Sequence, residues 1–83
     1  MITPAQCRAA RGLLSWRQQN LADRAGVGIM TIHQFEKGGS QPRRATLEVV
    51  RRAFENAGVE FIDENGGGAG LRLRKPGKRK PSE

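Results

Sequence analysis

Cationic side chains are the most abundant chemically active groups in this sequence of 83 residues. Fifteen lysines and arginines outnumber eight aspartates and glutamates, which gives a net charge of +7. Residues 1–44 carry seven basic and two acidic groups (+5), residues 45–70 two and five (−3), and residues 71–83 six and one (+5). Because lysine and arginine bind phosphate through charge-assisted hydrogen bonds, we expect part of the molecule to face nucleic acid or an anionic membrane surface.

The residue types that most often carry catalysis or bind metals are scarce. Cys7 is the only cysteine and His33 the only histidine, so an internal disulfide, a CxxC motif and a zinc site are not expected. The sequence also offers no paired carboxylates near a likely cleft and no arrangement of nucleophile, base and orienting group. We therefore expect Cys7 to be a small buried side chain, and we expect neither an enzyme nor a bound cofactor.

No stretch of the sequence suits a membrane. The longest apolar runs have only a few residues, too few to span a bilayer, and the N-terminal residues lack the apolar block of a signal peptide. The basic C-terminal residues have no accompanying apolar face that would anchor them. We expect one small domain with no membrane partner and a cytoplasmic location.

The spacing of apolar residues predicts four helices. Thr3, Pro4 and Gln6 form a start signal of N-cap, first-turn proline and capping box, and Gly26 ends the second helix in a left-handed conformation. The helices are expected at residues 4–14, 18–24, 29–37 and 44–57. The side chains expected in the core are Trp16, Leu21, Val27, Ile32, Phe35, Leu47, Val50 and Phe54.

The C-terminal third has a different pattern. Residues 59–62 and 71–74 are typical of short strands, and the glycine-rich segment between them favours a hairpin. Residues 75–83 are basic and contain proline, which is typical of a disordered tail. The chain is thus predicted to consist of a helical DNA-binding unit at 1–58, a strand pair and dimerisation element at 59–74, and a basic tail at 75–83.

Two short helices joined by residues 25–28 are the main functional signal. Ala22 is small where two helices must approach closely, and Gly26 supplies the turn between them. This spacing predicts a helix-turn-helix. The outer face of its second helix, residues 29–37, is then free to enter a major groove, which is wide enough for one helix.

The segments QQNLADRAGV at residues 18–27 and TIHQFEKG at residues 31–38 resemble the Cro/XRE family of phage-repressor-like regulators. The similarity extends through Thr46 and Leu47 to about Phe61. It implies a mainly α, lambda-repressor-like helix-turn-helix bundle of about four helices, with a small C-terminal β-hairpin or dimerising strands. Family members are mostly dimeric regulators of transcription that bind palindromic operators. The resemblance therefore implies a sequence-specific regulator, most simply a repressor, with double-stranded DNA as its partner.

The resemblance also implies roles for individual residues. Gln18 matches a glutamine that bonds a DNA phosphate and supports the recognition helix, and Arg11 with Glu36 matches an ion pair between the first and third helices. The residues expected to read bases are Ile29, Met30, Thr31, His33 and Gln34. The groups expected at phosphates are Arg17, Gln18, Gly28, Lys37, Ser40, Arg43 and Arg44. Among the readers, Gln34 is the strongest candidate because a glutamine amide can bond adenine in two places.

Four positions depart from the family pattern, and they leave a second hypothesis open. Arg17 stands where the family often has serine. Gly28 stands where serine or threonine is usual, so it offers only its backbone N–H to a phosphate. Ile29 and Met30 are apolar where polar readers are common. They could meet thymine methyl groups or a protein partner. The alternative is a protein-interaction module of the same fold, such as an antitoxin that binds a toxin or an anti-activator that binds an activator.

A homodimer is expected, because one copy of so small a module would read few base pairs. Family members often dimerise through a further C-terminal helix, but this chain has strand patterns there. Either strand could pair with its mate in a second copy, because an unpaired strand edge seeks a partner.

Overall fold

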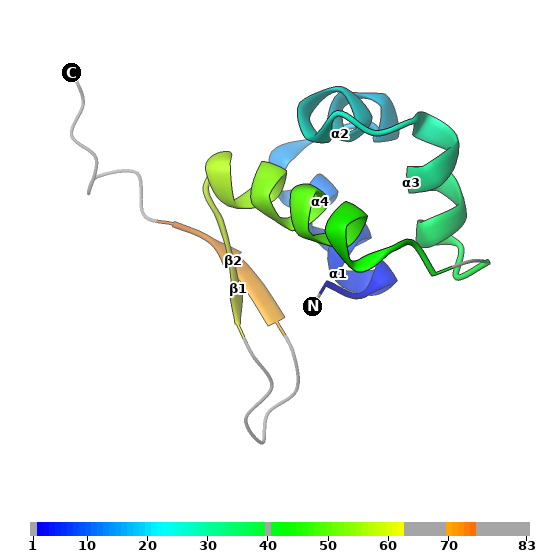
Figure 1. Ribbon diagram of the computed structural model, residues 1–83. Helices are drawn as coiled ribbons and strands as arrows, with labels where there is room; N and C mark the ends of the chain where they lie inside the picture. Colours follow the sequence, from blue (N-terminus) through cyan, green and yellow to red (C-terminus); the bar gives the residue numbers. More distant parts are fainter. Residues whose placement is uncertain (1, 40, 63–69, 75–83) are drawn as a thin grey trace.

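The structure, a computed structural model, describes residues 2–39, 41–62 and 70–74 (Figure 1). The described part contains four α-helices followed by a two-stranded antiparallel hairpin. Their bounds are α1 (Pro4–Leu14), α2 (Gln18–Ala25), α3 (Ile29–Glu36), α4 (Arg44–Asn56), β1 (Val59–Ile62) and β2 (Gly70–Leu73). The predicted mainly α bundle with a C-terminal hairpin is confirmed.

The start signal of α1 operates as predicted. The Thr3 hydroxyl accepts a hydrogen bond from the Gln6 backbone N–H at 3.1 Å, and the Gln6 side chain accepts one from the Thr3 N–H at 3.0 Å. This reciprocal capping box satisfies two N–H groups that a helix start otherwise leaves without partners. After Leu14 the chain leaves the helix at Ser15, whose φ of 57° is left-handed.

Several element ends differ from the predicted ones by a single residue. Helix α2 extends to Ala25, whereas α3 and α4 end one residue early because Lys37 and Ala57 are their C-caps. Strand β2 begins and ends one residue earlier than expected. Cap residues take only half of the helical hydrogen bonding, so a sequence pattern does not separate them from the last helical residue.

One hydrophobic core lies between the four helices and the hairpin. Six of the eight predicted core residues are buried, and the others, Trp16 and Val27, are half-buried at its edge. Trp16 lies in the link between α1 and α2, with one face stacked on Phe54 at a ring distance of 5.7 Å and with the Arg24 guanidinium 4.9 Å from its ring. Linking segments lie at the surface, which explains why these two apolar side chains are only partly covered.

The hairpin packs its apolar face against the helices. In its register Val59 faces Leu73 and Phe61 faces Leu71; Val59 is buried, and Phe61 and Leu71 pack against the core. The Gln6 side-chain amide donates to the Gly70 carbonyl at 3.4 Å, which links α1 to β2. A two-stranded hairpin alone is marginally stable, so this packing holds it. The predicted hairpin loop and basic tail fall at 63–69 and 75–83, outside the described residues.

None of the helices in the described ranges combines the length and the apolar character that a membrane crossing requires.

Candidate nucleic-acid interface

Helices α2 and α3 form a helix-turn-helix through a three-residue link. Gly26 ends α2 with a φ of 73°, a left-handed conformation that glycine adopts at no steric cost. The backbone N–H groups of Gly26 and Val27 both donate to the Ala22 carbonyl, at 2.9 and 3.1 Å. The chain therefore reverses tightly, and α3 lies at the edge of the bundle, on the side away from the hairpin in Figure 1.

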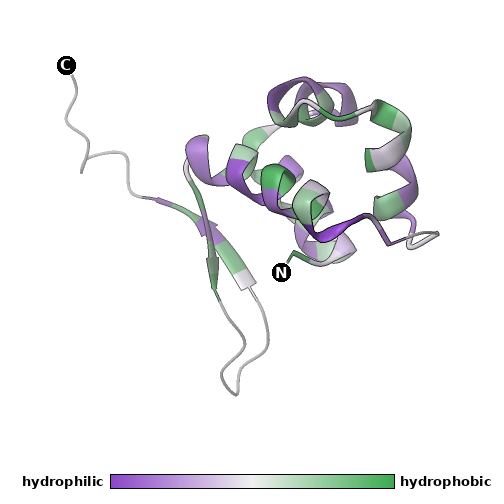
Figure 2. Cartoon of the chain, viewed as in Figure 1, coloured by the Kyte–Doolittle hydropathy of each residue, from purple (hydrophilic) through white to green (hydrophobic). Residues whose placement is uncertain are grey.

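Helix α3 has one buried and one exposed face. Ile32, Phe35 and Glu36 are buried. Their spacing of three and four residues places them on one side of a helix. The five predicted base readers are all exposed on the remaining surface: Ile29, Met30, Thr31, His33 and Gln34. Figure 2 shows hydrophobic colouring at the start of this helix, where Ile29 is 39% and Met30 60% exposed.

Exposed cations lie at the element ends that surround α3. Arg17 precedes α2, Lys37 caps the end of α3, Arg43 precedes α4, and Arg44 is the first residue of α4. None of these four forms a salt bridge with another residue of the described ranges. Their charge is thus directed to solvent or to a partner. Ser40, also predicted at a phosphate, lies outside the described residues.

The start of α3 exposes backbone donors. Gly28 is the exposed N-cap and has no side chain to cap the helix. The Gly28 carbonyl accepts hydrogen bonds from the N–H groups of Thr31 and Ile32, at 3.1 and 3.4 Å. The N–H groups before these belong to the first turn, where a helix supplies no carbonyl partner. Such N–H groups favour an anion nearby.

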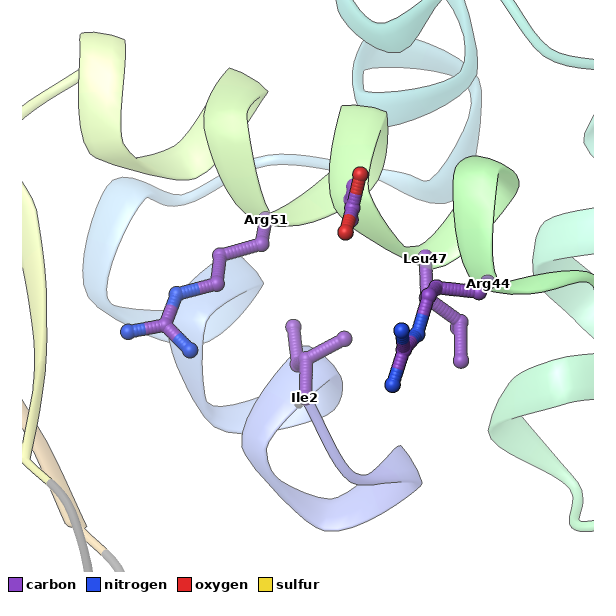
Figure 3. Close-up of a pocket in the computed structure, with 5 residues that line it drawn as sticks. Ile2, Arg44, Leu47 and Arg51 are labelled. Carbon is purple, nitrogen blue, oxygen red and sulfur yellow. The ribbon is translucent and has the colours of Figure 1, made fainter.

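Two neighbouring arginines line different hollows. Arg43 shares an open hollow between α3 and the start of α4 with Met30, Thr31, Gln34, Pro42 and Thr46. Arg44 instead lines a second hollow with Ile2, Leu47, Glu48 and Arg51, where the guanidinium groups of Arg44 and Arg51 lie on either side of Ile2 (Figure 3). The structure therefore brings Arg43 to the predicted readers and turns Arg44 toward the N-terminus.

Glu36 fixes the inner face of α3 through bonds to two other helices. Its carboxylate accepts from Arg11 at 2.8 and 2.7 Å and from the Gln18 amide at 3.0 Å. The Arg11–Glu36 ion pair thus ties α1 to α3, and Gln18 adds α2. The Gln18 amide nitrogen has two hydrogens, so one remains for another acceptor while the first supports α3.

Cys7 and Arg8 complete this network, and neither role was predicted from the sequence. The Cys7 thiol, fully buried as expected, is not merely apolar packing, because it donates to the Glu36 carboxylate at 3.1 Å. The Arg8 guanidinium donates to the backbone carbonyl of Glu36. Cys7 lies one helical turn before Arg11, and residues four apart share a helix face. The spacing of Cys7 and Arg11 could therefore have indicated that Cys7 also lies near Glu36.

The protonation states in this network follow from burial and hydrogen bonding. Burial opposes charge on Glu36, but the hydrogen bonds donated by Arg11, Gln18 and Cys7 outweigh it and lower the pKa of the carboxyl. Burial, and then the hydrogen bond to Glu36, raise the pKa of the Cys7 thiol. Cys7 therefore stays a neutral thiol at pH 7, and thiolate is the form that reacts as a nucleophile.

No protein-family model matches the chain, and no curated protein matches it.

Proposed function

We propose that this protein binds double-stranded DNA in a sequence-specific manner, with α3 in the major groove. The observation that supports this most directly is the exposed face of α3, which carries base-reading candidates. The cations around it form no salt bridge within the part of the chain that the structure describes. An α-helix with its side chains is about 10–12 Å across, and the major groove is about 12 Å wide. Arg17, Lys37 and Arg43 then contact the phosphates beside the groove.

The same proposal includes a homodimer on a palindromic operator. A single eight-residue recognition helix, about 12 Å long, covers only a few base pairs. Two copies related by a two-fold axis place their recognition helices about 34 Å apart, one turn of DNA. Occupation of a promoter by such a dimer blocks polymerase, so repression is the simplest regulatory outcome.

Selection of bound duplexes from a random pool by the full-length protein, at stated salt concentrations, tests this function. We expect enrichment of a palindrome with half-site centres about one helical turn apart. Binding is expected to weaken steeply with salt. Arg43→Ala should make the negative slope of log K against log salt shallower, by about 0.9 for each phosphate that is no longer neutralised. No enriched sequence, or binding that salt does not affect, would contradict the proposal.

A second candidate is a protein-interaction module such as an antitoxin or anti-activator. The exposure of Ile29 and Met30 at the start of α3 favours it, because exposed apolar groups also serve protein contacts. Co-purification with the product of a neighbouring gene tests this candidate. A partner that no longer binds the Met30→Lys variant but still binds Arg43→Ala would support it over DNA binding.

A further inference from the structure

Two exposed side chains of α3 lie side by side at the centre of its outer face. Met30 and Gln34 are four residues apart, and at 3.6 residues per turn their directions differ by only about 40°. Both point away from the side of Ile32, which is 1% exposed. Both also line the hollow that Arg43 borders. An apolar group and an amide are therefore presented together, beside a cation.

We propose that Met30 and Gln34 together recognise one A·T base pair or two adjacent ones. Met30 contacts the 5-methyl group of a thymine, and Gln34 bonds to an adenine. This inference rests on the proposed DNA binding and adds the base class that α3 prefers. In the major groove only thymine presents a methyl group, and adenine presents the N7 acceptor and N6 donor that match a glutamine amide.

The dimensions fit this pairing. A spacing of four residues separates Met30 and Gln34 by about 6 Å along α3, and successive bases of a strand are about 3.4 Å apart. The two side chains thus reach the same base pair or adjacent ones. Methionine is unbranched and polarisable, which suits contact with a methyl group whose position varies with local DNA geometry.

The surroundings of Met30 favour a DNA groove over a protein partner. Four of the six residues that line the hollow are polar or charged: Thr31, Gln34, Arg43 and Thr46. A standard protein interface needs about 800 Å² from each partner, with an apolar centre. A single methionine among polar and cationic side chains is instead complementary to the major groove of DNA. The groove is bordered by phosphates, and isolated thymine methyl groups lie on its floor.

Replacing single thymines by deoxyuridine tests the contact, because only the 5-methyl group is removed. The duplex is the sequence that the full-length protein enriches from a random pool, and Kd is measured at one stated salt concentration. We expect one thymine in each half-site at which the change weakens binding about fourfold, the effect of exposing one methyl group. Thymines elsewhere in the duplex are expected to respond little.

Protein variants then identify the side chain that senses the methyl group. Met30→Ala should bring the thymine-to-uracil ratio of affinities close to one, whereas Met30→Leu should keep it. Arg43→Ala is the matched control from the same hollow; it should weaken binding to both duplexes and leave the ratio unchanged. Because Met30 is 60% exposed, its variants should keep the circular dichroism and unfolding midpoint of the parent.

The possible failures can be told apart. If no duplex is enriched, the proposed function is wrong and this inference fails with it. If a duplex is enriched but its half-sites lack an A·T pair, or uracil has no effect, the inference alone is overturned. A thymine-to-uracil ratio that persists in Met30→Ala would also overturn it, because the methyl group would then act through DNA shape or another residue.

Discussion

At the scale of single residues, α3 carries a buried polar side chain, Glu36, and an exposed one, Gln34, which have different roles. Glu36 is 4% exposed and bonds to α1 and α2, so it sets the position of the helix. Gln34 is exposed two residues earlier and makes no hydrogen bond through its side chain with the described residues. Substitutions at these two positions should therefore affect different properties, stability at Glu36 and sequence preference at Gln34.

We expect Gln34→Ala to weaken binding to the preferred duplex by about 1–3 kcal/mol and to relax specificity at one base pair. Competition binding against duplexes changed at one base pair at a time measures both effects. Arg43→Ala is the control, because removing a phosphate-binding side chain weakens binding to all sequences alike. An equal loss of affinity on every duplex in Gln34→Ala would remove its base-reading role.

Glu36 makes the free energy of unfolding depend on pH. Its pKa is lowered in the folded protein, so its contribution is fully present above the ordinary value of 4.5 and is lost as the pH falls through the folded value. We expect Glu36→Gln to lower the free energy of unfolding by about 2 kcal/mol at pH 7, because the half-buried Arg11 loses its partner. The difference from the parent should shrink at pH 3 in urea unfolding.

Glu55→Gln is the control for that experiment. Glu55 pairs with Arg51 within α4, where the Arg51 side chain is 30% and the Glu55 side chain 44% exposed, against 4% for Glu36. Loss of this more exposed pair should change stability by less than about 0.5 kcal/mol at pH 7. Removing both members of the inner pair, as Arg11→Met with Glu36→Met, should cost less than removing Glu36 alone. A constant gap between the parent and Glu36→Gln from pH 7 to pH 3 would contradict the role of the charge.

At the scale of elements, the link between α2 and α3 decides where the exposed face of α3 points. Gly26 has the positive φ that ends α2, and both it and Val27 bond to the Ala22 carbonyl. The small side chain of Ala22 is buried beneath this reversal. The position of the proposed recognition helix therefore depends on one backbone conformation that L-residues rarely adopt.

Two glycine-to-alanine substitutions should have opposite effects on stability. Gly26→Ala forces a Cβ into a φ of +73° and should lower the free energy of unfolding by about 1–2 kcal/mol. Gly12 lies within α1 with no atom within 4 Å of an added Cβ, so Gly12→Ala should raise it by about 0.5–1 kcal/mol. Urea unfolding of both variants measures the signs, and the same sign for both would contradict this account.

At the scale of the whole molecule, the helical end and the hairpin end differ in character. Helix α3 lies at one end of the view in Figure 1, and the hairpin lies at the other. The hairpin carries the exposed apolar side chains Ile62 and Leu73, which are 38% and 45% exposed. A dimer formed through the hairpin would leave both copies of α3 uncovered.

We expect a chain that ends after Gly58 to dimerise more weakly, and also to unfold more easily because it loses the buried Val59. Full-length Ile62→Lys and Leu73→Lys separate the two effects, because both side chains are partly exposed and their replacement should leave the core intact. Val49→Lys on α4, at an equally exposed apolar position, is the control. Light scattering that finds the same dimer in the hairpin variants and the parent would exclude this interface.

The elements and their inward faces could be inferred from the sequence alone, because they depend on interactions between residues a few positions apart. The apolar spacing of Ile32 and Phe35 placed the buried side of α3, and Thr3 with Gln6 marked the start of α1. The glycine at position 26 marked the reversal between α2 and α3. Helical periodicity, capping and positive φ are local properties, so they can be inferred without knowledge of the tertiary structure.

Which distant groups share a site became clear only from the packing of the helices. That packing joined Cys7 and Gln18 to Glu36, left Trp16 half-covered at the core edge, and turned Arg43 and Arg44 into separate hollows. Each outcome depends on the angle and distance at which whole helices pack, and those follow from the combined fit of many side chains. The sequence could therefore place Met30 and Gln34 on one face of α3, but only the packed bundle brought Arg43 beside them.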